Sequence, residues 1–166
     1  MKYLKLFENF GTSSILFEVA LLLKLDEQTK KEVQTLFSGS EEASDLFPLP
    51  DEKLHITLTS IKNCKANKDT LKSSLPTDLV APKIIIGETT IAERPDTGKK
   101  SFVASVENQD ELKAFVDEVY SKMGLENPEP ERYFHITIAN NVENKKSPGV
   151  ADPFGSIGDV TKNDFM

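Results

Sequence analysis

Leu54-His55-Ile56-Thr57-Leu58 and Phe134-His135-Ile136-Thr137-Ile138 repeat one pattern, in which a His and a Thr alternate with three apolar residues. The two copies lie 80 positions apart (135 − 55), and they contain the only two histidines of the 166-residue chain. Successive side chains of a β-strand point to opposite faces, so each copy predicts a strand with one apolar face and one His/Thr face. We expect the apolar faces to pack on a core and the His/Thr faces to meet water.

The periodicity of apolar residues and the positions of Gly, Pro and capping residues predict the remaining elements. Each motif strand follows a loop with two prolines, Pro48 and Pro50 in one case and Pro128 and Pro130 in the other. The expected elements are an amphipathic turn or short helix at 2–10, a buried strand at 15–25, a helix at 27–37 capped by Asp26, an exposed loop at 38–51, a polar loop at 62–68, a short helix at 69–75, a strand at 83–91, a turn at 94–100, a strand at 102–106 and a helix at 110–123 that ends at Gly124.

The order strand, helix, motif strand therefore occurs in both halves of the chain. It predicts an α+β fold of two pseudo-symmetric lobes, antiparallel sheets flanked by helices, with the two motif strands facing a central cleft. Residues 140–166 are polar and rich in glycine, which predicts a mobile flap near that cleft.

The composition is typical of a globular protein, with 38% hydrophobic and 28% charged residues, and it predicts one domain over residues 1–166. The formal charge of −7 argues against a broad footprint on duplex DNA, but it is compatible with a small anionic ligand in a local pocket. Cys64 is the only cysteine, so we expect no disulfide within the chain and a reducing compartment. No stretch has the apolar length of a signal peptide or a membrane span, so we expect a cytoplasmic protein (in the host cytoplasm if it is viral) without a membrane partner.

Several roles are open to the histidine pair. The simplest is that His55 and His135 are polar members of half-exposed strands. A zinc site would need three or four ligands, and a third histidine is lacking. Nucleophilic catalysis has no support, because Cys64 lies outside any motif and no Gly-x-Ser-x-Gly elbow occurs. A glycine-rich phosphate loop is also lacking.

Phosphoryl transfer without a metal or other cofactor fits the motif pair better. A neutral imidazole can remove a proton from the attacking oxygen, and a protonated imidazole can supply one to the leaving oxygen. The hydroxyls of Thr57 and Thr137 can donate hydrogen bonds to the non-bridging oxygens, where negative charge is held in the transition state. If the attacker is a ribose 2′-hydroxyl, a 2′,3′-cyclic phosphate forms; if it is water, such a ring is opened.

The doubled His-x-Thr-apolar motif, its strand context and the duplicated layout resemble the 2H phosphoesterase superfamily over roughly residues 15–140. The resemblance implies that His55 and His135 are the catalytic pair and that Thr57 and Thr137 hold the phosphate. The superfamily contains RNA 2′,5′-ligase-like proteins, cyclic phosphodiesterases, phosphodiesterases that destroy oligoadenylate signals, and nucleotide-binding modules. These imply three expectations: cleavage of nucleotide 3′-5′ linkages, processing of RNA ends, or nucleotide binding without catalysis.

Within the superfamily the chain resembles in particular the phage anti-CBASS nucleases, which linearise cyclic di- and trinucleotide immune signals. The small size, the acidic charge and the polar tail after the second motif carry this resemblance. It implies a cyclic oligonucleotide substrate and bases stacked on Tyr133 and Phe154. Lys53 lies on the His55 face of its strand and could contact a phosphate; the alternative is an ordinary surface lysine. The structural alternatives are packing at a strand edge for Tyr133 and anchoring of the tail for Phe154. The oligomeric state is not indicated by the sequence.

Overall fold

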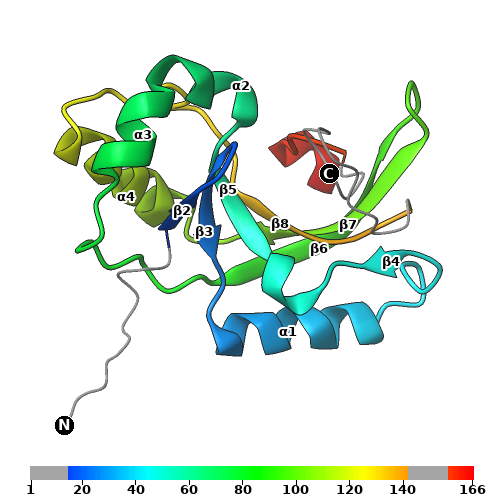
Figure 1. Cartoon of the computed structure of the whole chain (residues 1–166). Coiled ribbons are helices and arrows are strands. Elements are labelled where there is room, and N and C mark those ends of the chain that lie inside the picture. Colours follow the sequence, from blue (N-terminus) through cyan, green and yellow to red (C-terminus); the bar gives the residue numbers. More distant parts are fainter. Residues whose placement is uncertain (1–14, 142–156) are drawn as a thin grey trace, which may run out of the picture.

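The computed structural model describes residues 15–141 and 157–166. In these residues seven strands form one antiparallel sheet, in the order β2-β3-β5-β8-β7-β6, with β4 paired to β8 outside this path (Figure 1). The strands are β2 (Ile15–Phe17), β3 (Leu21–Lys24), β4 (Phe47–Pro48), β5 (His55–Thr59), β6 (Ile86–Arg94), β7 (Lys99–Val106) and β8 (His135–Asn140). The helices are α1 (Glu27–Ser38), α2 (Ile61–Cys64), α3 (Lys68–Ser74) and α4 (Gln109–Lys122), with the 3-10 helices η2 (Asp51–Lys53), η3 (Lys65–Asn67) and η4 (Lys162–Phe165).

Each half of the chain contributes a hairpin, a helix and a motif strand to this sheet. The first half supplies hairpin β2-β3, helix α1 and motif strand β5, and the second supplies hairpin β6-β7, helix α4 and motif strand β8. The motif strands β5 and β8 are hydrogen-bonded neighbours in the middle of the sheet, and the hairpins lie outside them. The expected α+β class is therefore confirmed. The motif strands, however, lie side by side in one sheet, whereas the sequence predicted that they would face each other across a cleft.

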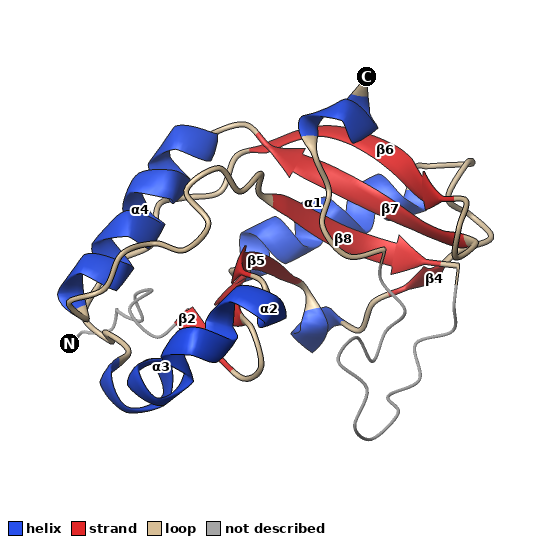
Figure 2. Cartoon of the chain, turned by 90° about the horizontal axis from the view of Figure 1, so that it is seen from above, coloured by secondary structure: helices blue, strands red, loops and turns tan. Residues whose placement is uncertain are grey.

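The apolar face of the motif strands forms the main core with the helices. Ile56 and Ile136 are fully buried, and they share one cluster with α1 and α4. Helix α1 contributes Val33 to this cluster, and its Phe37 ring contacts Phe102 of β7 at 6.4 Å between centroids. Figures 1 and 2 show α1 on the face of the sheet opposite to the C-terminal helix η4. Burial of the apolar face thus orients the His/Thr face toward the C-terminal segment.

Helix α1 begins as predicted, because the Asp26 side chain accepts a hydrogen bond from the Thr29 backbone N–H at 2.7 Å. Other segments differ from expectation. Residues 15–25 form a hairpin with a bend at 18–20, since an unbroken apolar run does not reveal a reversal of the chain. The predicted loops contain β4 and helix α2, both too short for a periodic signal. Strand β6 ends at Arg94, later than expected, because it pairs with β7 up to the turn. The expected turn or short helix at 2–10 lies outside the described residues.

The C-terminal residues 157–166 pack on the sheet, a contact that the prediction of a flap did not include. Val160 is buried in a small cluster with Ala92 and Val103, against which Ile157 and Phe165 also pack. An apolar side chain that reaches a sheet face is a stabilising contact, which the polar composition of the segment did not indicate. None of the helices in residues 15–141 and 157–166 has the length and apolar character that crossing a membrane requires.

Gly124 provides a test of how α4 ends. Its φ is +71°, and the Leu125 backbone N–H reaches the Tyr120 carbonyl at 2.9 Å, as in a left-handed helix cap. We expect Gly124→Ala to lower the free energy of unfolding by about 1–2 kcal/mol, because an L-residue is strained at this φ. Gly39→Ala, at the end of α1 with φ −88°, is the matched control and should cost less in urea unfolding. Equal costs for the two substitutions would contradict this account of the α4 cap.

Candidate functional site

The two His/Thr pairs lie on one face of adjacent antiparallel strands. Ile56 of β5 is opposite Ile136 of β8, and both point into the core. Successive side chains of a strand alternate between faces, so His55 and Thr57 of β5 and His135 and Thr137 of β8, which flank this pair, point to the opposite face of the sheet. These four residues are called the His/Thr patch. In agreement with this arrangement, the charge of His55 contributes to the pKa of His135.

His55 is half-buried, and its ring is oriented by the backbone just before β5. The Nδ1 atom lies 2.8 Å from the Lys53 carbonyl oxygen. Because a carbonyl only accepts, Nδ1 carries a proton, and Nε2 is the nitrogen that can exchange a proton with a ligand. A carbonyl acceptor also keeps its hydrogen bond when the ring is protonated, so this contact is compatible with the imidazolium form.

His135 and Thr137 are covered, contrary to the expectation that the His/Thr face meets water. Their exposed fractions are 7% and 9%. Burial, and after it the charges of Arg132, His55 and Arg94, lower the pKa of His135 to about 3, against the opposing effect of Asp164. His135 is thus a neutral imidazole near pH 7. The alternation of the motif predicted which face it occupies, but not that residues far along the chain cover this face.

The burial of His135 predicts a loss of stability in acid. The pKa of His135 is lower in the folded protein than its unfolded value of about 6.5, so below this pH the unfolded chain binds the proton first. The free energy of unfolding should therefore fall as the pH drops from 6.5 toward 3, by at most about 1.4 kcal/mol per pH unit from this group. Urea unfolding of wild type and of His135→Asn across this range isolates the contribution. Parallel pH profiles for the two proteins would contradict the burial of a neutral ring.

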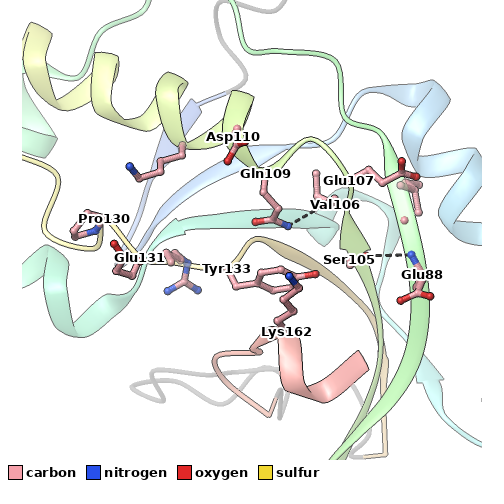
Figure 3. A pocket seen from close by; sticks show the side chains of 14 residues that line it. Glu88, Ser105, Val106, Glu107, Gln109, Asp110, Pro130, Glu131, Tyr133 and Lys162 are labelled. Carbon is pink, nitrogen blue, oxygen red and sulfur yellow. Dashed lines mark hydrogen bonds between the residues drawn. The ribbon is translucent and has the colours of Figure 1, made fainter. Parts of the chain in front are cut away.

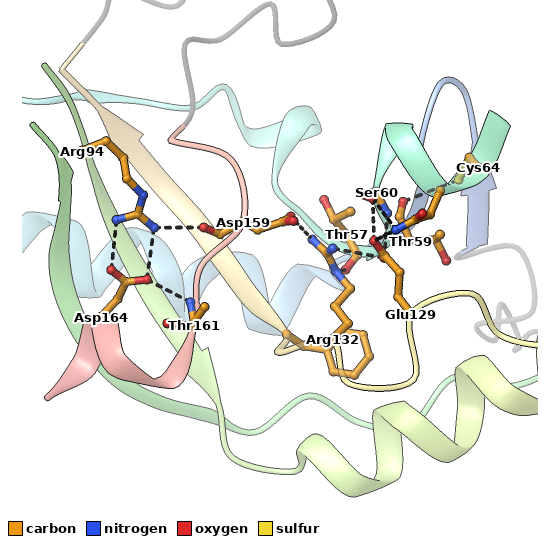
Figure 4. Close-up of polar contacts among 12 residues, drawn as sticks. Thr57, Thr59, Ser60, Cys64, Arg94, Glu129, Arg132, Asp159, Thr161 and Asp164 are labelled. Carbon is orange, nitrogen blue, oxygen red and sulfur yellow. Dashed lines mark hydrogen bonds and ion pairs between the residues drawn. The ribbon is translucent and has the colours of Figure 1, made fainter. Parts of the chain in front are cut away.

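Arg132 and Glu129 form a buried ion pair beside the motif strands (Figure 4). Arg132 Nε donates to the Thr57 carbonyl at 3.0 Å, and its Nη1 lies 3.2 Å from Glu129. Glu129 also accepts from the Ser60 N–H and hydroxyl and from Asn63. Burial alone would raise the pKa of Glu129, but the hydrogen bonds from Ser60 and Asn63 and the charge of Arg132 outweigh it, and the pKa is lowered. This network fixes the loop before β8 to the end of β5.

Arg94 is a second guanidinium near His135. Its two terminal nitrogens bind the two carboxylate oxygens of Asp164 at 3.0 and 3.1 Å, and Nη2 also reaches the Asp159 carbonyl at 2.9 Å. The Asp159 carboxylate accepts from Arg132 Nη2 at 2.9 Å. Residue Asp159 therefore connects the two guanidinium groups, as Figure 4 shows.

The arginines were not identified from the motifs, although the sequence contains a signal for them. Arg94 and Arg132 are the only two arginines of the chain, whose other 18 cationic residues are lysines (20 − 2). Arginine binds carboxylates and phosphates in a bidentate manner that lysine cannot reproduce. Two arginines among so many lysines indicate positions where this geometry matters.

Figure 3 shows the residues that line a cavity of about 830 Å³, and the four residues of the His/Thr patch are not among them. Ser105, which is opposite His135 on β7, lines it together with Tyr133, Gln109 and Lys162. The Tyr133 ring also contacts the Phe165 ring at 6.1 Å between centroids. Tyr133 thus lies both at a cavity that could hold a ligand and in a packing contact, so the structure is compatible with either of its predicted roles.

Of the other two predicted ligand residues, Lys53 does not line this cavity. Lys53 ends the 3-10 helix η2, and its backbone carbonyl, rather than its side chain, contacts His55. Phe154 lies outside the described residues. Within the described part of the chain, no group of three or more His, Cys, Asp and Glu side chains is arranged to hold a metal ion. Comparisons of the chain with protein-family models, with curated proteins and with solved structures find no match.

Proposed function

We propose that the protein is a metal-independent phosphodiesterase of the 2H type that cleaves nucleotide 3′-5′ linkages. The observation that carries the proposal is the patch of two histidines and two threonines on one face of adjacent antiparallel strands. The repeated hairpin, helix and motif strand, arranged symmetrically about the β5-β8 pair, support a 2H-like pseudo-symmetry of the two halves. Fold similarity would not by itself define an activity, so the proposal depends on the side chains of the patch.

In the proposed reaction His135 is the general base and His55 the general acid. His135 takes the proton of a ribose 2′-hydroxyl as its oxygen bonds to phosphorus, and His55 gives a proton to the 5′-oxygen as the phosphorus–oxygen bond breaks. The products are a 2′,3′-cyclic phosphate and a 5′-hydroxyl. His135 is neutral, which is the protonation state that a base requires, and the hydrogen bond from His55 to the Lys53 carbonyl is retained when His55 is protonated, as an acid requires. Thr57 and Thr137 would hold the non-bridging oxygens.

The proposed substrate class is a cyclic di- or trinucleotide, as in the anti-CBASS nucleases. A compact ligand suits a cavity of about 830 Å³, and the formal charge of −7 disfavours a long polyanionic RNA. A second candidate is a nucleotide-binding module without catalysis. The lowered pKa of His135 favours it, because a weakly basic imidazole accepts a proton poorly at neutral pH.

The deciding experiment is incubation of the protein with cyclic di- and trinucleotides and with an RNA ending in a 2′,3′-cyclic phosphate, in EDTA, with products identified by mass. Linear products from the cyclic nucleotides are expected. Opening of the RNA terminal ring alone would assign the activity to RNA ends, and tight binding without turnover would assign a binding module.

The internal nucleophile makes a separate prediction. A substrate with 2′-deoxyribose at the scissile position should be cleaved at least roughly 10³-fold more slowly than its ribose form, because an intramolecular attacker of high effective concentration is lost. The rates of the two substrates at equal occupancy check this expectation. Similar rates would show that water or another external group attacks the phosphorus.

A further inference from the structure

The C-terminal segment 157–166 covers the His/Thr face through an apolar contact and two ion pairs. Val103 of β7 is opposite Thr137 of β8, and opposite residues of antiparallel strands share a face. Val160, which packs on Val103, therefore lies over the face that carries the patch. Figure 2 shows the C-terminal helix in front of strands β6 and β7. The segment thus occupies space that a ligand on this face would need.

Both arginines bind carboxylates of this same segment. Arg94 grips Asp164 with both terminal nitrogens, in the geometry that a guanidinium also uses for phosphate. Arg132 directs Nη2 at Asp159. The charges of both guanidinium groups lower the pKa of His135.

Arg132 does not depend on the segment for its position. Its Nε and Nη1 are held by the Thr57 carbonyl and by Glu129, both outside residues 157–166. Without the segment, Nη2 would still point toward the face. The Asp159 side chain is 65% exposed, so water screens its ion pair with Arg132 and the pair is weak.

We propose that Arg94 and Arg132 are a phosphate-binding pair, and that Asp164 and Asp159 occupy it as internal substitutes for the phosphates of a nucleotide. The segment must then be displaced before a ligand binds, and the apparent affinity of the ligand is reduced by the fraction of molecules in which the pair is occupied. The assignment of nucleotide phosphates as the ligand rests on the proposed function. The binding of anions by the arginine pair does not rest on it, because binding can be measured without turnover.

The test is the binding of inorganic pyrophosphate to the full chain by calorimetry at low salt. Asp159→Asn/Asp164→Asn removes both internal carboxylates and should bind pyrophosphate roughly tenfold more tightly than wild type. Asp45→Asn/Asp96→Asn, which changes two exposed acidic residues, gives the same change in net charge and should gain much less. Addition of Arg94→Gln to the first variant should abolish the gain.

Equal affinities of the two double variants for pyrophosphate would overturn the proposal. Weaker binding by Asp159→Asn/Asp164→Asn than by wild type would also overturn it, because that result is expected if the segment helps to hold the ligand. If the double variant does not fold, Asp159→Asn alone should still bind about threefold more tightly, because this side chain is largely exposed; no gain there would also overturn the proposal. Tighter pyrophosphate binding with no cleavage of any nucleotide would support the proposal while the phosphodiesterase assignment failed.

Discussion

His55→Ala and His135→Ala should each lower the cleavage rate by roughly 10²- to 10⁴-fold, because each removes one of the two proton transfers. The loss should appear in kcat, since both interactions develop in the transition state. The rate of wild type in EDTA should equal its rate without chelator. Product formation from a cyclic dinucleotide, followed at saturating concentration, measures these rates.

The matched control is Thr89→Ala on strand β6, an exposed position of the same sheet. It should retain the wild-type rate, and circular dichroism should show that both histidine variants are folded. A histidine variant that keeps more than about a tenth of the wild-type rate would exclude that ring from acid–base catalysis.

Glu129→Ala should lower the free energy of unfolding by about 3–5 kcal/mol, the largest effect on stability that we expect. It leaves the Arg132 guanidinium buried without its carboxylate, and it removes the acceptor of the Ser60 and Asn63 hydrogen bonds. Glu129→Gln should cost less, because its carbonyl can still accept. Because the pKa of Glu129 is lowered in the folded protein, its contribution is complete above the unfolded pKa of about 4.3 and is lost as the pH falls through the folded value.

Glu131→Ala is the control two residues away, an exposed acidic side chain whose loss should change the free energy of unfolding by less than about 0.5 kcal/mol. Urea unfolding of these variants and of wild type at pH 7 and pH 4 measures the cost of each substitution and the dependence of that cost on pH. A cost of less than 1 kcal/mol for Glu129→Ala at pH 7 would show that the network does not hold the loop before β8 in place.

The alternating motifs contained enough information to predict the centre of the sheet. Buried Ile56 and Ile136 require that His55 and His135 point to the other face, and a period of two leaves no other arrangement in a strand. The helix after Asp26 followed from a capping interaction within four residues of sequence. Such features are local, so one stretch of the chain determines them.

The covering of the patch was not predictable in the same way. It depends on contacts such as Arg94 with Asp164 and Arg132 with Asp159, which are separated by 70 and 27 residues. No local pattern encodes such a distance. The acidic residues of the tail look like ordinary solvent-exposed charges until the sheet brings the arginines to them, and for this reason the segment was expected to be mobile.

The most direct test of the central claim, that the two histidines exchange protons with opposite oxygens of one phosphorus, uses a substrate with sulfur in place of the bridging 5′-oxygen. A thiolate leaves without being protonated, so the general acid becomes dispensable, whereas the base does not. The account predicts that His55→Ala cleaves this substrate within about tenfold of the wild-type rate and that His135→Ala remains slow. If both variants remain equally slow, the division of roles between the two imidazoles is contradicted.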